Sequence, residues 1–325
     1  MLHRFIVAIG AGCAAALLFV VGAESSALAM TLACLAPLPI MIATLGWGVD
    51  AGAIAAAISV GALALFAALA PVVEPLSDLL LFAVSVAAPA WGLAAFAITP
   101  VARYFGAQRP EAPVHPSVGA IVSLASVIGI LASAAVLTTR EGASQVAAAI
   151  AALTAEAYDG APDGLTARAF AETLVRFVPL AIAASSLLML CVNLYAAARS
   201  TQLSHSLPRP FPDVPTSLIL PWPLGVAFLA CVAAAYALPA PAAQYFSIGA
   251  GGLGGALALQ GLSVAHALSR GLKMRWLMLV ALYACCVLRA KYTLPVLAAL
   301  GLLDGFLRLR SRAALIPTPT PTGHK

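Results

Sequence analysis

The polar side chains that could do chemistry in this chain are few, and they lie inside long apolar runs. Gln260 is the most deeply placed, and His266 follows it by six residues, which puts the two about 120° apart on a helix. Hydrocarbon cannot satisfy such groups, so each must face protein or water. Gln260 is suited to line a solute cavity or to hydrogen-bond a neighbouring helix. His266 is suited to be a ligand, a proton relay or an interfacial residue.

A second candidate region is an apolar run interrupted by Pro37 and Pro39, which ends at Trp47 and meets Asp50. Each proline removes a backbone donor and clashes with the preceding turn, so this run predicts a broken helix. A broken membrane helix can build a solute site or be a plain structural kink. Asn193, near the end of a later run, could contact headgroups or cap a neighbour. The candidate substrate-binding residues are therefore Pro37, Pro39, Trp47, Asn193, Gln260 and His266.

Residues for catalysis or metal binding do not stand out. The sequence has no Ser/His/Asp set, no paired carboxylates within its apolar runs and no metal-spaced cluster, and its six cysteines form no Cys-x-x-Cys pair. The glycine-rich run near residue 250 lacks the following Lys-Ser/Thr of a phosphate loop. We therefore expect no catalytic residue, no metal, no cofactor and no enzymatic activity.

Composition places these residues in a membrane protein. Charged residues make up 9% of the 325-residue chain against about 25% in globular proteins. Hydrophobic residues reach 62%, and the mean hydropathy is +1.02. The net charge of +5 is too dilute to suggest nucleic acid. The pattern predicts an all-α, polytopic transmembrane helical bundle of about ten segments. We place the spans near 5–23, 27–46, 51–70, 78–98, 118–138, 177–198, 218–238, 245–268, 274–288 and 293–308.

The spans form a single transmembrane domain, 1–315, with two further parts. Apolar residues at helical spacing in 140–176 predict short amphipathic helices in one long outer loop, broken near Asp159. This loop could be a lid over a pore or a connector anchored on the membrane surface. The segment 316–325 alternates proline and threonine and predicts a disordered tail. The last two spans are short, so 274–308 could instead be one re-entrant hairpin.

Lysine and arginine placement predicts the orientation. With the N-terminus inside and ten spans, twelve basic residues lie inside and five outside, and the outer loop 140–176 is net acidic. We expect a bacterial inner-membrane protein, and for such a protein the positive-inside rule predicts both termini cytoplasmic and 140–176 periplasmic. Arg289 and Lys291 contradict the rule, because they fall outside.

Two spacings predict helix contacts near these candidates. GxxxG spacing occurs at Gly251 with Gly255, and at Gly301 with Gly305, and such bare flanks let helices approach closely. Asp304 stands four residues before Arg308, which predicts a helix-spaced ion pair at the membrane interface.

Several short stretches carry a resemblance to a known family. They are LAPLPI at 35–40, LGWG at 45–48, PAW at 89–91, NLYAAARS at 193–200, RPFPD at 209–213, QGLSVAH at 260–266 and GLLDGFLRLR at 301–310. Their order and spacing resemble the YybS-like family of multi-pass bacterial membrane proteins, in its alphaproteobacterial form. That family is distantly similar to the S-components of energy-coupling-factor vitamin transporters. The resemblance implies a helical bundle that holds a small solute, although this chain has about four more spans than an S-component.

Two functions follow as expectations. The first is a solute-binding or transport-related protein, with its cavity between the broken second span and the glycine-rich eighth. The alternative is a non-transporting membrane scaffold or envelope-assembly protein that binds proteins or lipids. The expected partners are the lipid bilayer, a small-molecule solute and other membrane proteins, and not nucleic acid.

Overall fold

The computed structural model describes residues 2–22, 27–69, 77–100, 114–139, 164–207, 209, 212–239 and 241–310, with six further positions between 144 and 155. Helices are the only regular structure in this part of the chain. They are α1 (Leu2–Val21), α2 (Ala27–Cys34), α3 (Pro37–Trp47), α4 (Val49–Leu69), α5 (Ser77–Phe82), the π-helix η1 (Ala83–Ala87), α6 (Ala88–Ile98), α8 (Val118–Thr138), α10 (Gly164–Leu203), α11 (Val214–Ser217), α12 (Trp222–Ala237), α13 (Ala242–Leu268), α14 (Arg275–Leu288) and α15 (Ala290–Leu307).

These helices make an integral membrane protein. Eight of the described helical segments are long and apolar enough to cross a bilayer, and α12 and α14 are shorter apolar helices. The expected all-α polytopic bundle of about ten segments is confirmed.

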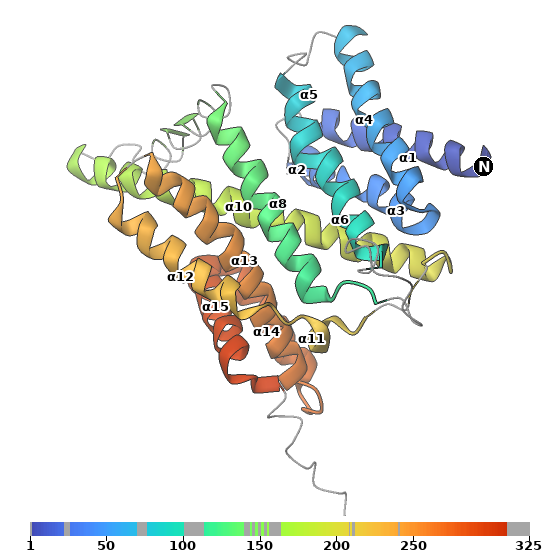
Figure 1. Ribbon diagram of the computed structural model, residues 1–325. Helices are drawn as coiled ribbons and strands as arrows, with labels where there is room; N and C mark the ends of the chain where they lie inside the picture. Colours follow the sequence, from blue (N-terminus) through green and yellow to red (C-terminus); the bar gives the residue numbers. More distant parts are fainter. Residues whose placement is uncertain are drawn as a thin grey trace, which may run out of the picture.

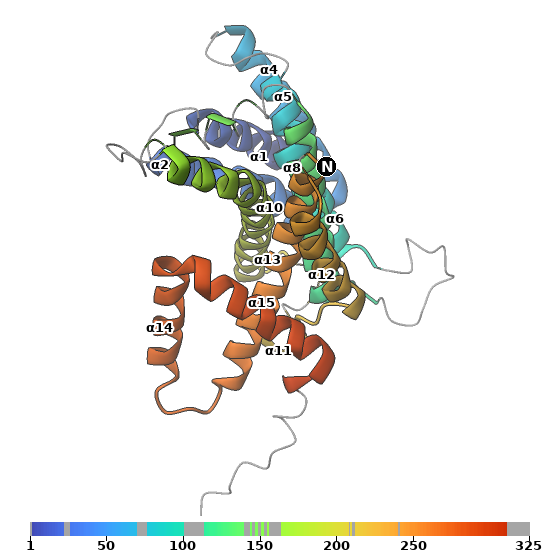
Figure 2. The ribbon, with the colours of Figure 1, turned by 90° about the vertical axis from the view of Figure 1, so that its left-hand side faces the viewer.

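The helices form two groups joined by one long helix (Figure 1). In the first group α1, α3, α4 and α6 pack against one another. In the second, α13 packs against α8, α10, α12 and α15. Helix α10 contacts both α3 and α13, so it lies between the broken second span and the glycine-rich helix (Figures 1 and 2). Helix α10 therefore separates the two spans between which the cavity was expected, and a cavity there stays a prediction.

Two expected boundaries also change. Helix α10 is 40 residues long and begins at Gly164, so the second half of the outer loop continues the sixth span instead of forming a separate surface helix. Most of 140–163 and all of 316–325 lie outside the described residues. Helix α12 begins at Trp222 and not near 218, because Leu218 and Pro221 are extended. The last two spans are separate helices, of 14 and 18 residues.

One end of the bundle gathers the connections that the sequence places on the cytoplasmic side. Arg209 donates to the Pro116 carbonyl at 3.3 Å, and Arg270 pairs with Asp213 at 2.7 Å. Trp91 Nε1 donates to the Val49 carbonyl at 3.1 Å, beside the α3–α4 connection. These contacts bring together connections that the expected topology places on one side of the membrane. Which compartment faces this end stays a prediction.

Candidate functional site

Helix α13 is the centre of the second group because its glycines admit neighbours on several sides. A methyl group at Gly251 would overlap the Leu180 carbonyl of α10, and one at Gly252 would overlap the Ile130 side chain of α8. At Gly254 it would come within 2.9 Å of Phe228 on α12. The bare flank thus serves close packing, the role that small residues commonly have in membrane helices.

The tightest approach is the crossing of α13 and α15. A methyl group on Gly301 would overlap the Leu257 carbonyl, and one on Gly261 would overlap the Leu297 carbonyl. Both clashes are with backbone, which cannot rotate away as a side chain can. Only glycine at these two positions lets the helices cross so closely, and the crossing sets where the next turn of α15 meets α13.

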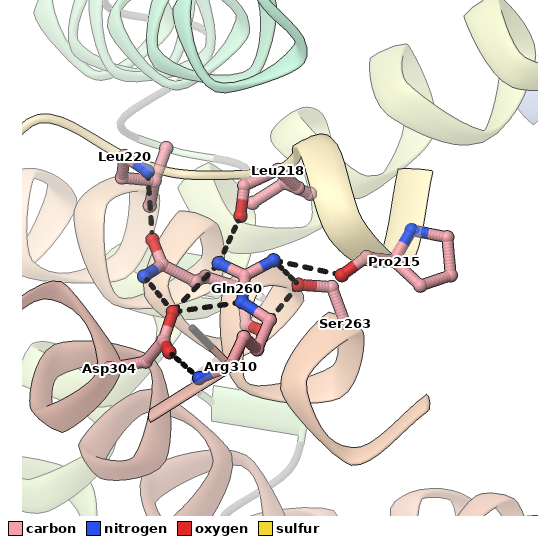
Figure 3. Close-up of polar contacts among 7 residues, drawn as sticks. All are labelled: Pro215, Leu218, Leu220, Gln260, Ser263, Asp304 and Arg310. Carbon is pink, nitrogen blue, oxygen red and sulfur yellow. Dashed lines mark hydrogen bonds and ion pairs between the residues drawn. The ribbon is translucent and has the colours of Figure 1, made fainter. Parts of the chain in front are cut away.

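Gln260 uses its amide to join three chain segments just beyond this crossing (Figure 3). Its oxygen accepts a hydrogen bond from the Leu220 backbone N–H at 2.9 Å, and its nitrogen donates to Asp304 Oδ2 at 3.0 Å. The side chain is fully buried. Its partners lie on the 218–221 segment and on α15. Gln260 is therefore an interhelical hydrogen-bonding residue, one of the two roles that its depth suggested.

Asp304 and Arg310 form a buried ion pair beside Gln260 (Figure 3). The Arg310 NH2 group lies 2.7 Å from Asp304 Oδ2, and the two side chains are 10% and 4% exposed. The expected partner, Arg308, is wrong for this pair. Arg308 takes a left-handed conformation with φ of 50°, so α15 ends there and the chain turns Arg310 back toward Asp304.

Arg310 also donates to backbone carbonyls in and after α11, a single helical turn whose carbonyls have no donor within a longer helix. Its NH1 and NH2 groups donate to the Pro215 and Leu218 carbonyls at 2.8 and 2.6 Å. NH1 lies 3.3 Å from Ser263 Oγ, which itself donates to the Gln260 carbonyl. A buried charge needs this degree of hydrogen bonding to offset its desolvation. We call Gln260, Ser263, Asp304 and Arg310 the polar cluster.

A small cavity lies against the polar cluster. Gln260 lines it together with Leu220, Trp222, Gly301 and Phe306. Its volume is about 10 Å³, close to the minimum of roughly 10–15 Å³ that one water molecule needs. Gln260 is the one strongly polar side chain in its lining, and the cavity has no room for a vitamin-sized solute.

The second ion pair differs from the first by its exposure. Arg270 and Asp213 lie 2.7 Å apart, with side chains 43% and 50% exposed. The hydrogen bond from Arg270 holds the pKa of Asp213 below its usual value, and a hydrogen bond from Thr216 adds to this effect. The pair tethers the segment before α11 to the end of α13, where water screens it.

Asn193 lies on α10 and hydrogen-bonds to the broken second span, away from the polar cluster. The Leu38 N–H bonds to the Leu35 carbonyl, which leaves the Cys34 carbonyl without its helical donor. Asn193 of α10 supplies that donor at 2.8 Å and is 2% exposed. It therefore caps a neighbouring helix, as one sequence alternative held. Pro37 and Pro39 cause the break that Asn193 repairs.

The other candidates lie apart from one another. Trp47 ends α3, and its ring lies 6.2 Å from that of His3. His266 Nε2 lies 2.8 Å from the Tyr283 hydroxyl and joins the end of α13 to α14. The structure thus brings only Gln260, of the six candidates, into the polar cluster. Asp304 appeared in the sequence analysis with a different partner. Ser263 and Arg310 were not among the candidates, although both lie in stretches quoted for the family resemblance.

Comparison with known proteins does not assign a family or a function to this chain. No protein-family model, no curated protein and no solved structure matches the chain.

Replacing Asn193 by leucine should destabilise the protein by about 1–3 kcal/mol, because the Cys34 carbonyl would lose its donor within an apolar span. Thermal unfolding in one detergent measures this effect. Ser186→Ala on the same helix is the matched control, since among the described residues Ser186 bonds the Ile182 carbonyl of its own helix and no other helix. Equal stability of the two variants would show that Asn193 does not hold the break.

Proposed function

We propose that this protein is a non-transporting membrane scaffold, a polytopic protein that holds a fixed helical arrangement and binds lipids or other membrane proteins. One observation carries this proposal. Gln260, the most deeply placed candidate for solute binding, uses both ends of its amide to join α13, α15 and the 218–221 segment. The polar groups around it are likewise engaged with one another or with backbone carbonyls.

The charge arrangement supports a holding role. Charged groups buried in membrane proteins commonly mark pathways for ions or solutes, and they then face a water-filled cavity. Here Asp304 and Arg310 face each other and backbone carbonyls at the end of the bundle. A charge pair in this setting fixes which chain segments meet, one of the roles that buried polar groups have in other proteins.

Solute binding is a second candidate function, and the small cavity favours it. Gln260 lines the cavity, and the resemblance to the YybS-like family would bring the comparison with S-components. For a vitamin-sized solute to fit, the crossing of α13 and α15 or the 218–221 segment would have to move. Such a movement would break hydrogen bonds of the polar cluster, so solute binding and cluster integrity would be coupled.

Gln260→Leu separates the two functions. As a scaffold, the variant should lose about 1–3 kcal/mol of stability, because the Leu220 N–H would be buried without an acceptor. Its content of co-purifying small molecules should equal that of the wild type. Thermal unfolding and small-molecule mass spectrometry on the same preparation in mild detergent measure both. A molecule that accompanies the wild type near one per chain, and is lost from a folded Gln260→Leu protein, would establish solute binding instead.

A further inference from the structure

Helix α14 is the described helix most separated from the bundle (Figure 2). None of its 14 residues is buried, and its exposed side chains are largely apolar, with Trp276 at 69%, Val287 at 80% and Leu288 at 77%. It contacts α15, and Tyr283 meets His266 of α13 in an edge-on ring contact at 5.8 Å. Such a surface in a membrane protein is covered by lipid or by another protein.

The start of α14 is strongly basic. Arg270, Lys273 and Arg275 lie within six residues, and the sequence has no acidic residue between Asp213 and Asp304. Asp213 pairs with Arg270, and Asp304 pairs with Arg310. Among the described residues Lys273 and Arg275 have no ion-pair partner, and Arg275 Nε is buried without a hydrogen-bond acceptor.

We propose that Lys273 and Arg275 bind the phosphate of an anionic phospholipid whose acyl chains lie along the exposed side of α14. Lys273 is exposed and Arg275 is half-buried, so a phosphate can accept from the Lys273 ammonium and the terminal nitrogens of Arg275, and guanidinium groups bind phosphate well. Trp276, next in the chain, has the amphipathic ring that commonly sits at headgroup level. Basic residues beside a membrane helix attract anionic lipids in the same way.

A lipid fits α14 better than a soluble anion or a protein helix does. The basic residues and the apolar helix are consecutive in the chain, which matches the headgroup and acyl chains of one molecule. At 1.5 Å per residue α14 is about 21 Å long, which is shorter than the roughly 30 Å hydrocarbon core. The bilayer must become thinner beside such a short helix, and a lipid bound at the start of α14 would lie where this thinning occurs. This site follows from charge and exposure alone, so its failure would leave the proposed scaffold role standing.

Quenching of Trp276 by brominated lipids tests the site on the full-length protein. The protein is reconstituted in phosphatidylcholine bilayers that contain either acyl-brominated phosphatidylglycerol or acyl-brominated phosphatidylcholine. The difference between wild type and Trp276→Phe isolates the signal of that tryptophan from the other three. We expect phosphatidylglycerol to quench Trp276 more strongly than phosphatidylcholine at equal mole fraction.

Lys273→Gln/Arg275→Gln should remove that preference. A basic side chain near an anionic surface strengthens binding by about fivefold, so removing two should lower the relative affinity for phosphatidylglycerol by about 30-fold. Arg289→Gln/Lys291→Gln is the matched control, since it removes two cations from the opposite end of α14. The control should keep the preference of the wild type.

Four results would overturn the proposal. Equal quenching by the two lipids would show that no headgroup is selected, and an equal loss in the Arg289→Gln/Lys291→Gln control would show only an effect of net charge. Competition by millimolar inorganic phosphate would assign the two basic residues to a free anion. Protection of Trp276 from both lipids would show that a second copy of the chain covers α14.

Discussion

Replacing Asp304 by alanine should destabilise the protein by about 3–5 kcal/mol, the largest loss expected for any side chain of the polar cluster. The change leaves Arg310 10% exposed and without its carboxylate, and it also removes the acceptor of the Gln260 amide. The remaining carbonyls of Pro215 and Leu218 carry no full negative charge. Thermal unfolding in a single detergent, with the wild type alongside, measures the loss.

Asp213→Ala is the matched control for this change. It breaks an Asp–Arg pair with the same 2.7 Å separation, but with both side chains about half exposed. Solvent and salt screen such a pair, so its removal should leave stability almost unchanged. A comparable loss in the two variants would mean that burial of the Asp304–Arg310 pair has no special importance.

The double variant Asp304→Leu/Arg310→Met asks whether the charges themselves are needed. Apolar groups of similar size often replace a buried ion pair with little loss, because the desolvation of both charges is removed as well. We therefore expect the double variant to be more stable than Asp304→Ala. A double variant that loses more would show that the carbonyls of the 215–220 segment require the guanidinium of Arg310.

The sequence predicted the membrane helices well because their signal is local. Apolar runs of spanning length, and the two prolines that break the second span, require no knowledge of neighbours. Glycine spacing also indicated correctly that α13 and α15 each have a flank that another helix approaches closely. It could not give the partners, since Gly301 meets Leu257 and Gly261, which lie about 40 residues away.

The polar cluster could be predicted only in part, because it depends on a chain reversal. The helical rule pairs Asp304 with Arg308, four residues later. Arg308 instead ends the helix in a left-handed conformation, which moves Arg310 to the carboxylate. Pro221 likewise delays the start of α12 and leaves the Leu220 N–H free for Gln260. The end of α15 at Arg308 and the late start of α12 leave no periodic pattern of apolar residues from which they could be predicted.

The second large loss of stability is expected at the crossing of α13 and α15, where a single added methyl group is enough to cause it. Gly301→Ala should destabilise the protein by about 3 kcal/mol, because the added carbon overlaps the Leu257 carbonyl and lies 2.9 Å from the Gly261 nitrogen. Gly305→Ala, one turn later on the same helix, is the control. Its nearest neighbour would be the Gln260 nitrogen at 4.0 Å, an ordinary contact, so the control should be close to wild type in thermal unfolding.

The same variant tests whether the crossing and the polar cluster form one unit. Asp304 follows Gly301 by three residues, so a shift of α15 away from α13 also moves its carboxylate from Gln260. Gly301→Ala combined with Asp304→Ala should then lose less stability than the sum of the two single losses, as coupled sites do. Strict additivity would mean that the carboxylate keeps its place when the helices separate. The crossing would then be a packing contact alone, and the position of Asp304 would be set by Arg310 and the 215–220 segment.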